Sequence, residues 1–112
     1  MVHNSKNLYI CSMDILERNI NNLKKLCVKH NVSELYAFGS VLTNKFQDES
    51  DIDLLISFKK IDINDYSDNY FDLKFSLEEL FDRKVDLLEE KAIKNPFLKL
   101  SIDKSKKLIY GN

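Results

Sequence analysis

The sequence predicts a single α/β domain over residues 1–112, in which helices pack on a small sheet. Its 112 residues, 44% of them hydrophobic, suffice for one buried core and are too few for two. Stretches with apolar residues at helical spacing alternate with short, continuous apolar runs typical of strands. The predicted order of elements is helix, strand, strand, helix, strand, helix.

The first helix is predicted over residues 12–30. Its apolar side chains share one helical face and should cover the core; they are Ile15, Leu16, Ile20, Leu23, Leu26 and Cys27. His30 falls near the end of this helix, where an imidazole commonly meets free backbone carbonyls, and His3 lies in the terminus. Neither histidine is a candidate catalyst. Cys11 and Cys27 lack the close spacing of a metal knuckle, so we expect reduced thiols.

Two strands and a turn follow. Residues 34–38 read as a short strand that stops at Gly39, with a turn and one helical turn over residues 41–45. Gly39 allows the backbone to approach a ligand closely. Residues 51–58 form a second, largely buried strand. Because side chains alternate along a strand, Asp51 and Asp53 should point to one face, roughly 6 to 7 Å apart along the strand.

The second half of the chain supplies the remaining elements. A helix over residues 66–82 carries one apolar stripe, made of Tyr66, Tyr70, Leu73, Leu77, Leu80 and Phe81. Residues 85–88 form a third strand in which Asp86 stands among apolar neighbours. Pro96 begins a last helix, ahead of residues 108–110, and its Phe97, Leu100 and Ile102 are expected to pack inward.

Charge narrows the classes of function. The net charge is −1, which argues against bulk nucleic-acid binding. Residues 47–90 hold fourteen acids and five bases, so this region favours cations. The basic tail that follows either solvates a surface or faces an acidic partner. No apolar segment resembles a signal peptide or a membrane span, so we expect no membrane partner and a cytoplasmic protein.

The acidic motifs each have an ordinary interpretation. Asp51 and Asp53 could be solvated acids at a loop edge, Gly39-Ser40 an ordinary turn, and Asp86 an ion-pair partner of Arg83 or Lys84. Taken together, however, these motifs would gather three carboxylates beside a turn that is large enough to hold a phosphate group. Such a gathering is costly without cations, because like charges repel.

Divalent cations relieve this repulsion, and a site made only of oxygen ligands favours Mg²⁺ or Mn²⁺ over zinc. Two such ions can clamp the attacking and leaving oxygens of a phosphoryl group, while backbone N–H groups and the Ser40 hydroxyl hold the other phosphates. The pattern therefore indicates nucleotidyl transfer.

The stretch of residues 35–88 resembles the minimal nucleotidyltransferases of the DNA polymerase beta-like superfamily. Their signature is Gly-Ser, a spacer, Asp-x-Asp and a third Asp on a later strand. The resemblance implies a palm-like fold with a small mixed sheet and flanking helices. It implies Asp51 and Asp53 as metal ligands, and Asp86 as the residue that completes the metal site or helps to activate the acceptor. Gly39 and Ser40 would hold the triphosphate.

The turn after Gly-Ser departs from the family pattern. Members often have Gly-Ser-x-Ala-Arg-Gly, where this chain has Val41-Leu42-Thr43-Asn44. Thr43 stands at the arginine position and remains a candidate nucleotide contact. Without the arginine charge, nucleotide binding should depend steeply on Mg²⁺.

The resemblance also implies a reaction. It predicts transfer of a nucleoside monophosphate, AMP from the donor ATP, to an acceptor hydroxyl, and it extends to antitoxins that modify a tyrosine of a HEPN-type toxin. A binding module that neutralises its partner by contact alone is the alternative, and nucleotide turnover with the partner separates the two. Transfer to a small molecule such as an aminoglycoside is disfavoured, because the chain has no second substrate-binding domain.

Overall fold

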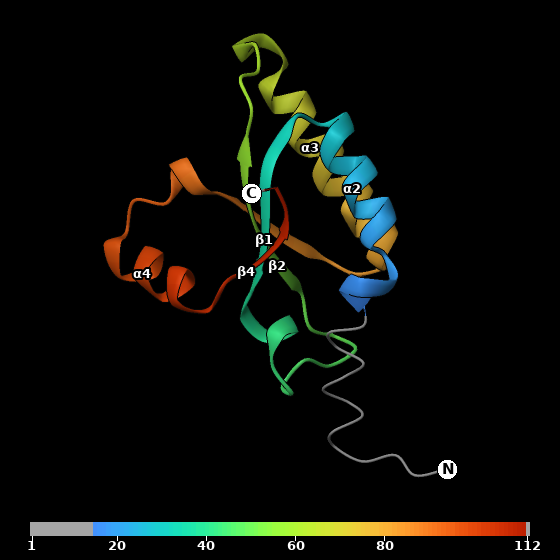
Figure 1. Cartoon of the computed structure of the whole chain (residues 1–112), viewed down its shortest axis with the longest axis vertical. Helices are drawn as coiled ribbons and strands as arrows, with labels where there is room; N and C mark the ends of the chain where they lie inside the picture. Colours follow the sequence, from blue (N-terminus) through green and yellow to red (C-terminus); the bar gives the residue numbers. More distant parts are fainter. Residues whose placement is uncertain (1–14, 112) are drawn as a thin grey trace.

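The computed structural model describes residues 15–111 (Figure 1). A helical turn at residues 15–18 leads into the main elements. These are α2 (Ile20–Lys29), β1 (Val32–Phe38), η1 (Gly39–Leu42), β2 (Ile52–Phe58), α3 (Ile63–Phe81), β3 (Val85–Glu89), η2 (Glu90–Ala92), α4 (Pro96–Ser105) and β4 (Lys107–Tyr110), where η1 and η2 are 3₁₀ turns. No helix within the described range is long and apolar enough to cross a membrane.

The four strands form one mixed sheet in the order β3-β2-β1-β4. β1 pairs antiparallel with both β2 and β4, and β2 pairs parallel with β3 through the α3 crossover. Helices α2 and α3 lie together on one face of the sheet, and α4 lies on the other side (Figure 1). The predicted mixed sheet with flanking helices is confirmed. The fourth strand was not predicted, because its four residues are too short a run to show periodicity.

The core lies between the sheet and helices α2 and α3. It includes residues from both helices and the inward-facing strand positions, namely Leu16, Leu23, Cys27, Val32, Leu35, Ala37, Val41, Ile52, Leu54, Ile56, Leu73, Leu77, Phe81, Val85 and Leu87. Cys27 is a free, buried thiol whose pKa burial raises to about 12, as expected for a structural cysteine. Cys11 lies outside the described residues.

The predicted first helix is interrupted at Asn19. Its side chain donates a hydrogen bond to the carbonyl of Ile15 at 2.7 Å, and such a local side-chain bond competes with regular helix. At the other end His30 is buried, with Nδ1 2.8 Å from the Leu26 carbonyl and Nε2 2.6 Å from Asp72 of α3. The predicted contact of His30 with a helix-end carbonyl is confirmed, and the imidazole also joins α2 to α3. Residues 12–14 and His3 lie outside the described residues.

The prediction for α4 was partly wrong. Ile102 is buried, whereas Phe97 and Leu100 are 82% and 54% exposed. At about 100° per residue, both lie on the opposite side of the helix from Ile102, while Leu98, four residues before it, shares its face. The helix starts where Pro96 predicted, because the Asn95 side chain accepts from the backbone N–H groups of Phe97 and Leu98.

Candidate active site

Asp53 and Asp86 lie side by side on neighbouring strands. The parallel pairing of β2 with β3 sets Asp53 opposite Asp86, between the pairs Ile52–Val85 and Leu54–Leu87. Those four apolar residues are buried in the core beneath α2 and α3. Because side chains alternate, the two carboxylates point to the opposite face of the sheet. The structure thus brings two of the three predicted acids together.

Asp51 lies two residues before Asp53, just ahead of β2, and is exposed. Its effect is electrostatic: the pKa of Asp53 is raised to about 6, first by burial and then by the negative charges of Asp86 and Asp51. A carboxyl that desolvation and like charges keep partly protonated is typical of a site built to receive cations.

Gly39 lies against Asp53. β1 pairs with β2 so that Phe38 faces Asp53, which places the next residue, Gly39, over the carboxylate. A Cβ atom on Gly39 would lie 2.3 Å from Asp53 Oδ2, and Gly39 has φ +75°. Both the space and the backbone conformation therefore require glycine here. The close contact that the structure shows for Gly39 is with the Asp53 carboxylate, and its predicted approach to a ligand stays a prediction.

The turn that follows is held by its own hydrogen bonds. The backbone N–H and the hydroxyl of Thr43 both donate to the Ser40 carbonyl at 2.9 Å, and Lys45 N–H donates to the Thr43 hydroxyl at 3.2 Å. Buried Val41 anchors the turn in the core. The structure thus gives the Thr43 hydroxyl a role in shaping the turn, while half-buried Ser40 lies directly after Gly39.

Arg83 is a positioning residue that the sequence did not reveal. Its Nη1 donates to the carbonyls of Gln47 and Ser50, both at 3.0 Å, and its guanidinium lies 4.4 Å from the centre of the Phe46 ring. It therefore ties the spacer loop, residues 43–51, to the corner between α3 and β3. Arg83 therefore does not form the ion pair with Asp86 that the sequence allowed. Contacts to distant backbone carbonyls leave no signal in the sequence.

The donor chemistry of this site fits a hard divalent cation. Asp53 and Asp86 project from adjacent strands and Asp51 from the loop beside them, so all three offer oxygen ligands. Within residues 15–111, no three Asp, Glu, His or Cys side chains converge as a ready metal site. The strand register places the Asp53 and Asp86 backbones side by side, and the side chains of the three acids do not converge in this structure.

Comparison with known proteins identifies the family of this chain. The family described as polymerase beta nucleotidyltransferase matches residues 21–112. The chain belongs to this family. As a nucleotidyltransferase it has relatives in Methanocaldococcus jannaschii that are named "putative protein adenylyltransferase". One is 39% identical over 87% of this chain and 91% of its own length, and another is 37% identical over 73% and 79%.

Solved structures show the same fold. A structure described as a "putative minimal nucleotidyltransferase" superposes with a TM-score of 0.71 at 25% identity, over 85% of this chain and 93% of that one. The MNT antitoxin complexed with a tri-AMPylated HEPN toxin of Shewanella oneidensis gives a TM-score of 0.61 at 22% identity, over 87% and 73%. The predicted polymerase beta palm-like fold is confirmed.

Proposed function

We propose that this nucleotidyltransferase moves AMP from ATP to a hydroxyl group of a partner protein, and that the partner is a HEPN-type toxin which the chain thereby neutralises. The observation that carries the proposal is the pairing of Asp53 with Asp86 beside the Gly39 turn. The names of the Methanocaldococcus jannaschii relatives support a protein as acceptor. We propose the cytoplasm as the compartment.

Each site residue receives a role in this proposal. Asp51, Asp53 and Asp86 would hold Mg²⁺ or Mn²⁺, which would supply positive charge to neutralise the phosphates. Gly39 and Ser40 border the triphosphate, since their turn lies against Asp53 on the β1 side. Asp86, on the β3 side, faces the acceptor. Thr43 contributes indirectly, because its hydroxyl donates to the Ser40 carbonyl and so stabilises the turn that borders the triphosphate.

The reaction is a displacement at phosphorus. The acceptor oxygen forms a bond to the α-phosphorus as the bond to the bridging oxygen of pyrophosphate breaks. The hydroxyl proton passes to a carboxylate on the acceptor side, for which Asp86 is placed. The protein contributes orientation. It holds the α-phosphate of ATP and the acceptor hydroxyl side by side, so the reaction does not depend on their collision in solution.

Transfer of label from ATP labelled at the α-phosphate tests this proposal. A purified HEPN-type toxin from the same organism should become labelled with wild type and Mg²⁺, and should stay unlabelled with Asp53→Asn. Asp48→Asn is the matched control, because Asp48 is an exposed acid of the spacer loop. Equal labelling by wild type and Asp53→Asn would reject the assigned carboxylate.

A contact-only binding module is the second candidate, and the turn favours it. Thr43 replaces the cationic residue of related turns, and its hydroxyl is engaged with Ser40. In that case Asp53→Asn should still bind the toxin and suppress its activity as fully as wild type. Loss of neutralisation by Asp53→Asn, with binding retained, decides for catalysis.

A further inference from the structure

We propose that a groove along the free edge of β3 docks the acceptor protein through one large apolar side chain that has a basic residue on its α3 side. The groove has a volume of about 540 Å³. It is lined by α3, β3, the segment between β3 and α4, and the first turn of α4, and its main apolar side chains are Tyr70, Phe71, Leu88, Ile93 and Leu98. We call it the β3 groove.

Its place in the sheet puts the β3 groove on the acceptor side. The phosphate turn at Gly39 lies on the β1 side of Asp53, whereas Asp86 lies on the β3 side. β3 is an edge strand, so nothing in the sheet stands beyond it. Leu87, Leu88 and Glu89 line the groove directly after Asp86 on the same strand. A protein seated there has its surface within a few residues of the proposed acceptor-side carboxylate.

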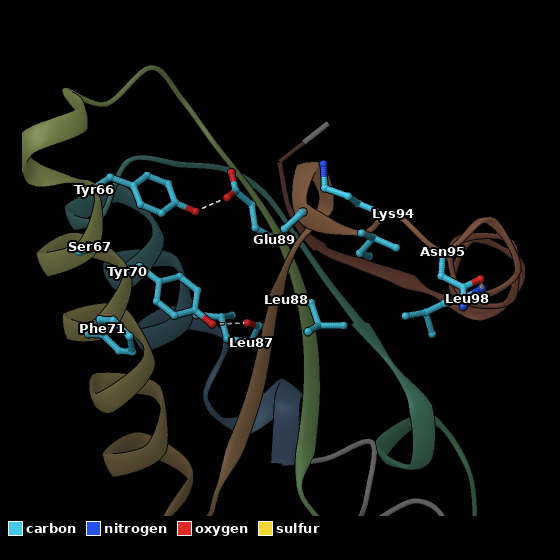
Figure 2. A pocket seen from close by; sticks show the side chains of 12 residues that line it. Tyr66, Ser67, Tyr70, Phe71, Leu87, Leu88, Glu89, Lys94, Asn95 and Leu98 are labelled. Atoms are coloured by element: carbon cyan, nitrogen blue, oxygen red, sulfur yellow. Dashed lines mark hydrogen bonds between the residues drawn. The ribbon is translucent and has the colours of Figure 1, made fainter.

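The aromatic walls of the groove are held in place by hydrogen bonds. The Tyr70 hydroxyl donates to the Leu87 carbonyl and the Tyr66 hydroxyl donates to Glu89, so both rings are fixed against β3. Figure 2 shows these aromatic side chains on the α3 side of β3, and Leu98 and Asn95 on the other side. Polar groups of the wall thus satisfy one another and present ring faces to an occupant.

Exposed aromatic rings extend the groove along α3. Phe71 is 50% exposed and stacks at 6.1 Å on Phe75, which is 60% exposed, and Leu98 on the opposite wall is 45% exposed. Clustered exposed aromatics beside a pocket are typical of a protein interaction site. An aromatic or leucine side chain of the partner is the occupant that such walls fit.

The charges around the rings specify the rest of the partner. Asp68 and Glu79 are exposed one turn from Phe71 and Phe75, and Glu89 lines the groove itself. The nearby Lys74 is paired with Glu78 at 3.3 Å. Lys94 lines the opposite side of the groove, so the acidic charge is confined to the side formed by α3 and Glu89. Electrostatic complementarity therefore favours a Lys or Arg of the partner on that side of its apolar anchor. This inference rests on the proposed function, because it identifies the occupant as the HEPN-type acceptor.

Calorimetry with a HEPN-type toxin from the same organism tests the docking. All variants carry Asp53→Asn, so that binding is measured without modification. Leu98→Asp should raise the Kd tenfold or more, because it removes an apolar side chain from the wall and requires a charged carboxylate to be desolvated against the apolar anchor of the partner. Phe97→Asp is the matched control, because Phe97 is the neighbouring residue of the same helix, is 82% exposed and does not line the groove. With this variant the Kd should stay within about twofold of the parent value.

A second pair of variants guards against a local defect of α4. Phe71→Asp on α3 should weaken binding as Leu98→Asp does, while Val28→Asp on α2, also at an exposed position, should not. Thermal melting confirms that each variant folds. ATP affinity, measured without Asp53→Asn, should be unchanged in all four.

The outcomes separate docking from catalysis. Loss of binding by both groove variants and retention by both controls supports the docking site, even if wild type transfers no label, in which case only the proposed function fails. Equal binding by groove and control variants overturns the docking site. Absence of binding by wild type also overturns it, since the proposal commits to this occupant.

Discussion

At the scale of single residues, the site depends on one tightly placed carboxyl. Asp53 lies between the Gly39 backbone, at the end of β1, and Asp86 on β3. Its raised pKa of about 6 records the cost of that position in the absence of a cation. Because of this position, replacing Asp53 should abolish transfer and at the same time stabilise the metal-free fold.

Asp53→Asn should stabilise the metal-free protein at neutral pH. The pKa is higher in the folded than in the unfolded chain, so ionisation of Asp53 destabilises the fold as pH rises from about 4 through about 6. Above that range the variant should gain roughly 1 to 2 kcal/mol, discounted for solvent screening. Urea unfolding in chelator at pH 7.5 and pH 4 checks this. A gain of the same size at both values would contradict the electrostatic cause.

Gly39→Ala should perturb the fold mainly through Asp53. A left-handed alanine alone costs about 1 to 2 kcal/mol, and its Cβ would also displace Oδ2 of the carboxylate. Asp53→Ala removes the obstructing atoms, so Gly39→Ala should cost less in that background. Unfolding free energies of both single variants and the double variant give the coupling, expected to be about 1 kcal/mol or more. Additive costs would show that the two residues do not meet.

At the scale of elements, the corner between α3 and β3 organises the acidic site. Glu78 near the end of α3 accepts from the N–H of Val85 at 3.1 Å, and Arg83 holds the carbonyls of Gln47 and Ser50. One corner thus positions the start of β3, which carries Asp86, and the loop that carries Asp51.

Arg83→Lys should loosen the spacer loop while the core stays intact. A lysine offers a point charge and cannot reproduce the planar guanidinium that reaches two carbonyls and stacks on Phe46. We expect several-fold weaker ATP binding with little change in melting temperature, and faster amide exchange in residues 43–51. Lys84→Arg, at an exposed neighbouring position, is the control. Unchanged exchange in the loop would contradict this role.

The elements also show what the sequence could predict. Long periodic segments such as α3, and the apolar runs of β2 and β3, were found nearly at their observed bounds, because burial on one face leaves a clear pattern. α4 was assigned the wrong buried face, because its apolar residues point in several directions and only Ile102 meets the core. Arg83 and β4 were missed, because both depend on contacts between distant segments.

At the scale of the whole molecule, the sheet separates two approaches to one carboxylate pair. The phosphate turn lies on the β1 side and the open groove on the β3 side. Within residues 15–111 the groove has two walls, one from α3 and one from the segment around Leu98, and it stays open between them. A protein acceptor is therefore the natural way to cover it. The Gly-Ser and Asp-x-Asp motifs indicated the chemistry from sequence, whereas the groove could be found only from the assembled fold.

The most direct measurement is the intact mass of the HEPN-type protein after co-expression with this chain. Wild type should add one or more AMP groups to it, and tryptic fragments should place them on a hydroxyl side chain. Co-expression with Asp53→Asn should leave its mass unchanged. The control variant Asp48→Asn, tested separately, should modify it as wild type does. An unmodified HEPN-type protein beside wild type, with toxicity suppressed equally by wild type and Asp53→Asn, would contradict the account.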